Sequence, residues 1–171
     1  MPQSDHPPLQ RHAALAPLSR DHYTGLVQSQ RLMKAADHDD VARRQAVAAF
    51  VDASDQEIAQ HFADEERLLT GLIGDDDRQR LLREHRELTE AADLLRQLRK
   101  RTDPDAQALR QTGQRLRDHI RWEERELFER LQRDLPEDQL AALARATDEV
   151  EQSRPRNVRQ QKDSLRKGVD T

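Results

Sequence analysis

The stretches His61-Phe-Ala-Asp-Glu65 and His119-Ile-Arg-Trp-Glu123 each place a histidine four residues before a glutamate. Residues at this spacing lie about 40° apart around a helix and roughly 6 Å apart along it, so both side chains can reach one site. Two further histidines, His22 and His85, lie in other segments. All four histidines stand where the apolar stripe of a helix would carry leucine, which predicts that they face the interior of a helical bundle.

The composition favours an all-α protein with one domain. The chain has 171 residues, of which 36% are charged and 35% hydrophobic. Leucine and alanine recur at helical spacing over long stretches, whereas β-branched residues are few and strand-like alternation is absent. A chain of this length has enough residues to bury a substantial core.

The helical pattern predicts four long helices and a short fifth one. We expect the helices at about residues 18–37, 41–73, 76–101, 104–133 and 137–151. The second helix would be close to 50 Å long, so we expect a bend or break in it. Connections of about two to six residues make sequential helices antiparallel, which predicts an up-down-up-down four-helix bundle.

Local signals suggest where these helices begin and end. Ser19 is a candidate cap for the first helix, Gly74 a stop for the second, and Asp103 with Pro104 a start for the fourth. We interpret residues 1–15 as a flexible leader, 16–151 as the bundle domain and 152–171 as a basic tail. The apolar stripes place Leu26 inward on the first helix, and Gly25 and Gly113 are compatible with close approach of a neighbouring helix or with a bend.

The arrangement of histidine and glutamate repeats along the chain. A helix with one histidine is followed by a helix with His-x-x-x-Glu, at an interval of 39 residues from His22 to His61 and 34 residues from His85 to His119. Burying six titratable groups together is costly unless something compensates them, and a pair of metal ions is the simplest compensation. Each carboxylate has two oxygens and can bridge two ions, while the imidazoles supply two nitrogens to each ion.

We therefore predict a dinuclear metal site. Its ligands are the four histidines and the two glutamates at the four-residue spacing: His22, His61, Glu65, His85, His119 and Glu123. Glu66 and Glu124 lie about 140° around the helix from their histidines, so we expect them to face solvent or a neighbouring helix.

Other kinds of site are excluded or disfavoured. The chain has no cysteine, which rules out thiolate zinc sites, iron–sulfur clusters and thiol catalysis. The net charge of −4 with interspersed signs gives no electrostatic case for nucleic acid or an anionic membrane. We expect His6, His12 and His38 not to be ligands, because two lie in the leader and one in an acidic turn. The amino-terminal residues show no signal pattern, so we expect a soluble, cytoplasmic protein.

At these residues the chain resembles the hemerythrin-like, or HHE cation-binding, family. The resemblance rests on His22, on HFADE at 61–65, on Glu84 and His85, and on HIRWE at 119–123, and it covers about residues 15–150. It implies a non-haem di-iron centre in a four-helix bundle, with the six predicted ligands at the matching positions. The chain departs from oxygen-carrying members in two places. Thr89 stands where they have a second histidine on the third helix, and the last carboxylate fits better four residues after His119, whereas theirs usually lies five residues after the histidine.

The resemblance implies two Fe ions with an oxo or hydroxo bridge, although histidine and glutamate also suit Mn and Zn. The missing imidazole implies more open coordination at the third-helix ion, and this chain looks more like the six-ligand branch of the family. We expect a protein that binds O2 or NO, or senses iron or redox state. The alternatives are a di-iron enzyme that reduces NO or peroxide or handles iron in stress repair, and a helical interaction module without metal.

A few other residues could support the site or bind a partner. Glu84 and Thr89 are candidates for contact with the ligands, with a solvated position favoured for Glu84. Trp122 and Phe128 are interpreted as packing residues. The six basic residues from Arg154 to Lys167 favour a solvated tail over a contact with nucleic acid or a partner. The sequence leaves the oligomeric state open.

Overall fold

The computed structural model describes residues 10–154, and these residues form helices and no strands. In chain order the elements are α1 (Ala16–Ala35), α2 (Asp40–Ala53), η1 (Ser54–Ile58), α3 (Ala59–Leu69), α4 (Asp75–Leu98), α5 (Ala106–Trp122), η2 (Glu123–Leu127), α6 (Phe128–Asp134) and α7 (Glu137–Ser153). The segments η1 and η2 are π-helical turns that continue directly into the α-helices on either side. The predicted all-α class is confirmed.

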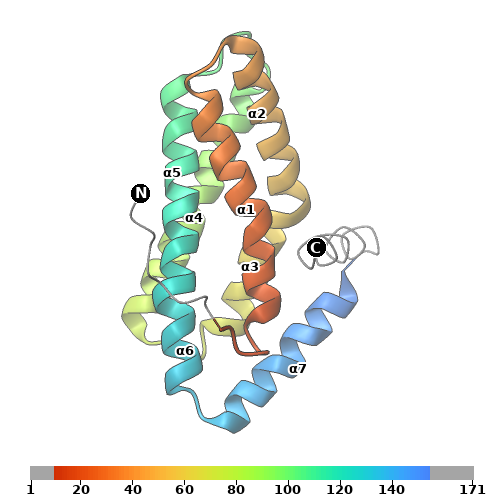
Figure 1. Cartoon of the computed structure of the whole chain (residues 1–171), viewed down its shortest axis with the longest axis vertical. Helices are drawn as coiled ribbons and strands as arrows, with labels where there is room; N and C mark the ends of the chain where they lie inside the picture. Colours follow the sequence, from red (N-terminus) through yellow and green to blue (C-terminus); the bar gives the residue numbers. More distant parts are fainter. Residues whose placement is uncertain (1–9, 155–171) are drawn as a thin grey trace.

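Four long helical rods form an antiparallel bundle (Figure 1). The rods are α1, α2 to α3, α4, and α5 to α6, and the chain reverses direction at each connection. The fifth helix, α7, has 17 residues, ends two residues beyond the predicted range of 137–151, and contacts α1 and α3. In the described part of the chain, no helix combines the length and the apolar character needed to cross a membrane.

Some predicted helix ends are wrong. Ser19 does not cap α1, which begins after Leu15 and has Pro17 in its first turn. The cap of α5 is Asp105 and not Asp103, because the Asp105 carboxylate accepts a hydrogen bond from the backbone N–H of Gln107 at 3.0 Å. A carboxylate so close to the first free N–H groups satisfies them better than one two residues earlier.

The second rod shows the predicted irregularity, as the π-helical turn η1. It ends at Leu69 and not near Ile73, and Gly74 caps the start of α4 with extended backbone. The turn η2 in the fourth rod was not predicted. A π-helical turn inserts one extra residue into a helix and leaves little trace in the apolar pattern.

The core consists of two apolar clusters that occupy opposite ends of the bundle. One includes Leu32, Phe50, Leu95 and Leu109, and the other includes Leu15, Leu69, Leu81, Leu127 and Phe128. Each of the four histidines lies in sequence between residues of the first cluster and residues of the second. The polar groups of the bundle are thus enclosed by apolar layers on both sides.

The described part of the expected leader packs against the bundle. Ala14 and Leu15 are fully buried, and the Arg11 guanidinium forms ion pairs with Glu124 at 2.7 Å and Glu129 at 3.1 Å. Residues 1–9 of the leader and 155–171 of the tail lie outside the described residues.

The helices α1 and α5 pack closely along their length. Gly25 and Gly113 permit this, since a Cβ atom on Gly113 would lie 2.7 Å from the Ser29 carbonyl oxygen and one on Gly25 would lie 2.7 Å from the end of Ile120. The side chain of Leu26 was predicted to point inward, but it is 40% exposed. The face of α1 that packs on α5 contains Gly25 instead. Ser29 also donates a hydrogen bond to the Gly113 carbonyl at 2.8 Å.

We expect Gly113→Ala to lower the free energy of unfolding by about 1–3 kcal/mol, because a backbone oxygen can move aside only if the two helices separate. The control is Gly71→Ala, whose added methyl would meet nothing within 4 Å and should cost no stability. Urea unfolding of the metal-free proteins measures both. Equal stability of the two variants would contradict the close packing of α1 on α5.

Candidate metal centre

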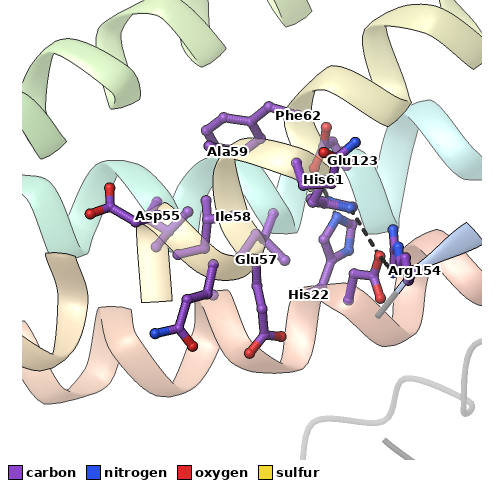
Figure 2. Close-up of a pocket in the computed structure, with 15 residues that line it drawn as sticks. His22, Asp55, Glu57, Ile58, Ala59, His61, Phe62, Glu123 and Arg154 are labelled. Atoms are coloured by element: carbon purple, nitrogen blue, oxygen red, sulfur yellow. Dashed lines mark ion pairs between the residues drawn. The ribbon is translucent and has the colours of Figure 1, made fainter. Parts of the chain in front are cut away.

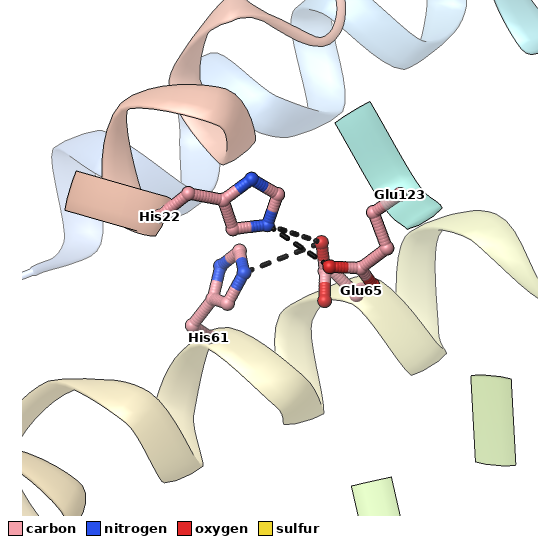
Figure 3. A group of neighbouring side chains, drawn as sticks. All are labelled: His22, His61, Glu65 and Glu123. Atoms are coloured by element: carbon pink, nitrogen blue, oxygen red, sulfur yellow. Dashed lines mark ion pairs between the residues drawn. The ribbon is translucent and has the colours of Figure 1, made fainter. Parts of the chain in front are cut away.

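The six predicted ligands converge in the middle of the bundle, and each is at most 6% exposed. They come from all four rods and form two sets that share both glutamates. One set is His22, His61, Glu65 and Glu123, and the other is Glu65, His85, His119 and Glu123. Within each set, one possible ligand atom from every residue lies within 4.8 Å of the others, a spacing that can hold a metal ion. Figure 3 shows the side chains of the first set pointing toward one another.

The two glutamates each face both histidine pairs. Glu65 places Oε1 3.3 Å from His61 Nε2 and Oε2 3.4 Å from His85 Nε2. Glu123 likewise places Oε2 3.1 Å from His22 Nε2 and Oε1 3.2 Å from His119 Nε2. Each carboxylate therefore divides its two oxygens between the two halves of the site, as a bridging ligand does.

The atoms that face the centre lack hydrogen bonds. The Nε2 atoms of all four histidines and both carboxylate oxygens of Glu65 and Glu123 are buried and have no hydrogen-bond partner among the described residues. Buried polar atoms are nearly always paired, since leaving one unpaired costs about 1–3 kcal/mol. A pair of cations between these nitrogens and oxygens would satisfy all eight atoms, so the residues fit a dinuclear metal site.

Three of the histidines are held from behind by glutamates. The Nδ1 atoms of His22, His85 and His119 lie 2.6, 2.9 and 2.8 Å from carboxylate oxygens, which belong respectively to Glu124, Glu66 and Glu84. An Nδ1–H that donates to a carboxylate fixes the ring orientation and leaves Nε2 free to bind a metal. Each of these three glutamates therefore orients a histidine on a neighbouring helix. Two of them, Glu66 and Glu124, directly follow the inward glutamates in sequence.

The solvated position predicted for Glu84 is wrong, because its carboxylate contacts His119. Glu66 and Glu124 do turn away from their own helix's histidine, as predicted, but their targets on neighbouring helices were not identified. Thr89 does not contact a ligand side chain, because its hydroxyl donates to the His85 backbone carbonyl at 2.8 Å. His38 is exposed and hydrogen-bonds the Lys34 carbonyl, and His12 accepts from the Ala14 N–H.

His61 is arranged differently from the other three histidines. Its Nδ1 lies 3.5 Å from Oδ2 of Asp21, a buried aspartate that precedes His22 on α1. No pattern in the sequence distinguished Asp21 from other acidic residues, which are most often exposed. The same aspartate also contacts Arg154, whose Nη1 lies 2.6 Å from Asp21 Oδ2.

The facing acids and bases shift each other's pKa. Burial alone lowers the pKa of His85, but the Glu123 and Glu65 carboxylates outweigh this effect and raise the pKa to about 10. The same opposition raises the pKa of His22, His61 and His119. Burial raises the pKa of Glu65, but the imidazoles around it bring the pKa well below its usual range. The two carboxylates thus favour the protonated, positively charged form of the imidazoles around them.

A cavity of about 390 Å³ opens beside the His22 and His61 half of the site (Figure 2). Its walls include the apolar side chains of Ile58, Phe62 and Ile120, and His22, His61 and Glu123 lie at one side of it. A smaller cavity of about 160 Å³ reaches His119 between Arg80 and Glu84.

The ring of Phe62 stacks on His85, with centroids 4.1 Å apart and planes at 15°. More open coordination at the third-helix ion stays a prediction. The larger cavity borders the other half of the site, while the ring of Phe62 lies against the imidazole of His85.

A four-helix bundle with histidines and bridging carboxylates projecting inward from all four rods defines a class of dinuclear metal proteins. A family model for the hemerythrin HHE cation binding domain matches residues 14–131, so the chain belongs to this family. The search of curated proteins and the search of solved structures each found no match to the chain.

We expect Glu84→Ala to weaken metal binding by about 10–100-fold, because His119 loses the carboxylate that orients it. Glu84→Gln should weaken it less, since the amide oxygen can still accept the Nδ1–H hydrogen bond. Glu90→Ala changes an exposed residue on the same helix and is the matched control. Competition with a chelator of known affinity measures all three, and a Glu84→Ala affinity equal to that of Glu90→Ala would contradict the role of Glu84.

Proposed function

We propose that the chain holds two iron ions and binds O2 or NO, or senses iron or redox state, at an open coordination position. One ion is held by His22 and His61 and the other by His85 and His119, with Glu65 and Glu123 bridging both. The proposal depends on one observation. Each buried carboxylate places one oxygen near one histidine pair and the other oxygen near the second pair, and the Nε2 atoms of these histidines have no hydrogen-bond partner among the described residues.

The donor set supports iron through its chemistry. Imidazole suits Zn, Cu, Fe and Ni, carboxylate suits harder cations such as Mn, and the mixture of both is compatible with Fe, Mn or Zn. Membership of the hemerythrin family favours iron among them. A reduced iron pair supplies the electrons and the binding position for a diatomic ligand.

The chain's own residues shape what the centre can do. Four ligand atoms for each ion leave coordination positions free, and the cavity beside His22 and His61 can admit a small ligand. Two carboxylates and four neutral imidazoles donate less negative charge than the mostly carboxylate sets of di-iron oxygenases. Reversible binding or sensing is therefore favoured over oxidation of C–H bonds.

A second candidate is an enzyme that reduces NO or peroxide at the same centre. The observation in its favour is the size of the cavity, because about 390 Å³ is far more than a diatomic ligand needs. Iron handling in stress repair belongs to the same alternative. The third candidate, an interaction module without metal, leaves the eight unpaired buried atoms unexplained. The cytoplasmic location remains a prediction from the sequence.

Metal content tests the proposal directly. We expect chain loaded with ferrous iron under anaerobic conditions to retain two ions, and His61→Ala and His119→Ala each to lose at least one, because each removes a ligand nitrogen. His38→Ala should retain both ions, since His38 is exposed and distant from the centre in the fold. Negligible iron in the unmodified chain would reject both metal-based candidates, and equal loss in all three variants would reject the ligand assignment.

Stopped-flow mixing of the reduced protein with NO or peroxide separates the two metal-based candidates. We expect one stoichiometric event for each iron pair, because the ligand set favours attachment of the ligand over repeated reduction. Many turnovers in the presence of a reductant would establish the enzyme instead. His119→Ala is the control, since loss of the pair should abolish either signal.

A further inference from the structure

Arg154 lies at the end of α7, in a part of the chain beyond the residues that match the family model. Its side chain is only 12% exposed and lines the cavity beside His22 and His61 (Figure 2). The guanidinium connects two helices, because Nη1 lies 2.6 Å from Asp21 Oδ2 and Nη2 lies 3.1 Å from Asp64 Oδ2. These aspartates immediately precede His22 and Glu65 in sequence.

The contact with Asp21 matters because of His61. The other three ligand histidines each have Nδ1 within 2.9 Å of a glutamate oxygen, whereas His61 Nδ1 lies 3.5 Å from Asp21 Oδ2. That oxygen is the one that Arg154 binds. The position of the carboxylate behind His61 therefore depends on Arg154, the residue that follows α7, and the position of the other three carboxylates does not.

We propose that Arg154 is a positioning residue for His61, one of the two histidines that would hold the ion nearer the larger cavity. The proposal rests on the proposed function for the presence of that ion, but the positioning of the ring is a property of the chain alone. A guanidinium holds carboxylates with a rigid fork of donors, so Arg154 fixes Asp21 beside the His61 ring.

Removal of Arg154 would take away the guanidinium that lies between the buried carboxylates of Asp21 and Asp64. Without this ion pair, the Asp21 carboxylate would no longer be held in its place beside the His61 ring. A ligand histidine without its orienting carboxylate binds metal more weakly, typically by about 10–100-fold.

The chain offers a matched control in Arg20, whose Nη2 lies 2.7 Å from Glu151 Oε1. This pair also fastens α7 to α1, through different side chains. Arg20→Ala therefore loosens α7 while leaving Arg154 beside Asp21. Arg154→Lys keeps the charge and removes the fork, which separates charge from geometry.

The first experiment follows release of ferrous iron from the loaded full chain to a colorimetric chelator without oxygen. We expect Arg154→Ala to release one of the two equivalents about tenfold faster than the unmodified chain and the other at an unchanged rate. Arg154→Lys should lie between the two, and Arg20→Ala should match the unmodified chain. Faster release of both equivalents, of neither, or the same effect in Arg20→Ala would overturn the proposal.

The second experiment uses the metal-free chain and records the imidazole ¹⁵N signals of His61 and His85 by NMR. We expect Arg154→Ala to shift the His61 signals and leave those of His85 in place, and Arg20→Ala to shift neither. Unchanged His61 signals in Arg154→Ala would refute the positioning role. If the unmodified chain takes up no iron, the proposed function fails, and the ring signals still decide whether Arg154 positions His61.

Discussion

The structure depends on four imidazole nitrogens and four carboxylate oxygens that face one another without hydrogen bonds in the middle of the bundle. Water is largely excluded there by the apolar clusters on both sides, so the charges interact strongly and any imbalance is costly. In the metal-free chain, protons on the imidazoles provide the balance, as the raised pKa values of the histidines indicate. Cations placed between the same atoms would provide it with better geometry.

This constraint explains features of the fold that are distant from the ligands. The ligands of all four rods must lie at the same level along the bundle axis. The closely packed helices α1 and α5 therefore have to keep a fixed position relative to each other along that axis. Gly113 brings the α5 backbone against Ser29 of α1, and the hydrogen bond from Ser29 to the Gly113 carbonyl fixes the two helices at that level. The π-helical turn η2 begins at Glu123. At this point of the fourth rod, Glu123 points to the centre and the next residue, Glu124, contacts Nδ1 of His22. Such turns frequently occur at functional sites.

The sequence predicted the helices and the six inward residues because both follow from periodicity along single helices. His61 with Glu65 and His119 with Glu123 lie on one helical face by spacing alone, and the apolar residues before and after them predict burial. The glutamates that contact the histidine Nδ1 atoms were harder to predict from the sequence, because the contacts of Glu84 with His119 and of Glu66 with His85 join two different helices. Such contacts depend on the rotation and height of a neighbouring rod. Arg154 was interpreted as part of a tail, because no pattern within that segment shows that it returns to the bundle.

The two halves of the centre have the same ligand types but different surroundings. The His85 ring is covered by Phe62 and held at 2.9 Å by Glu66, so this half is shielded and its ligand is rigidly oriented. The His61 ring borders the larger cavity, and its Nδ1 faces an aspartate at 3.5 Å that is shared with Arg154. Both the orientation of the ligands and the access of solvent tune a metal ion, so two ions bound by these equal ligand sets would differ in their properties. The difference between the two halves arises from Phe62, Asp21 and Arg154. These residues are not ligands, and the His-x-x-x-Glu motif does not predict their positions.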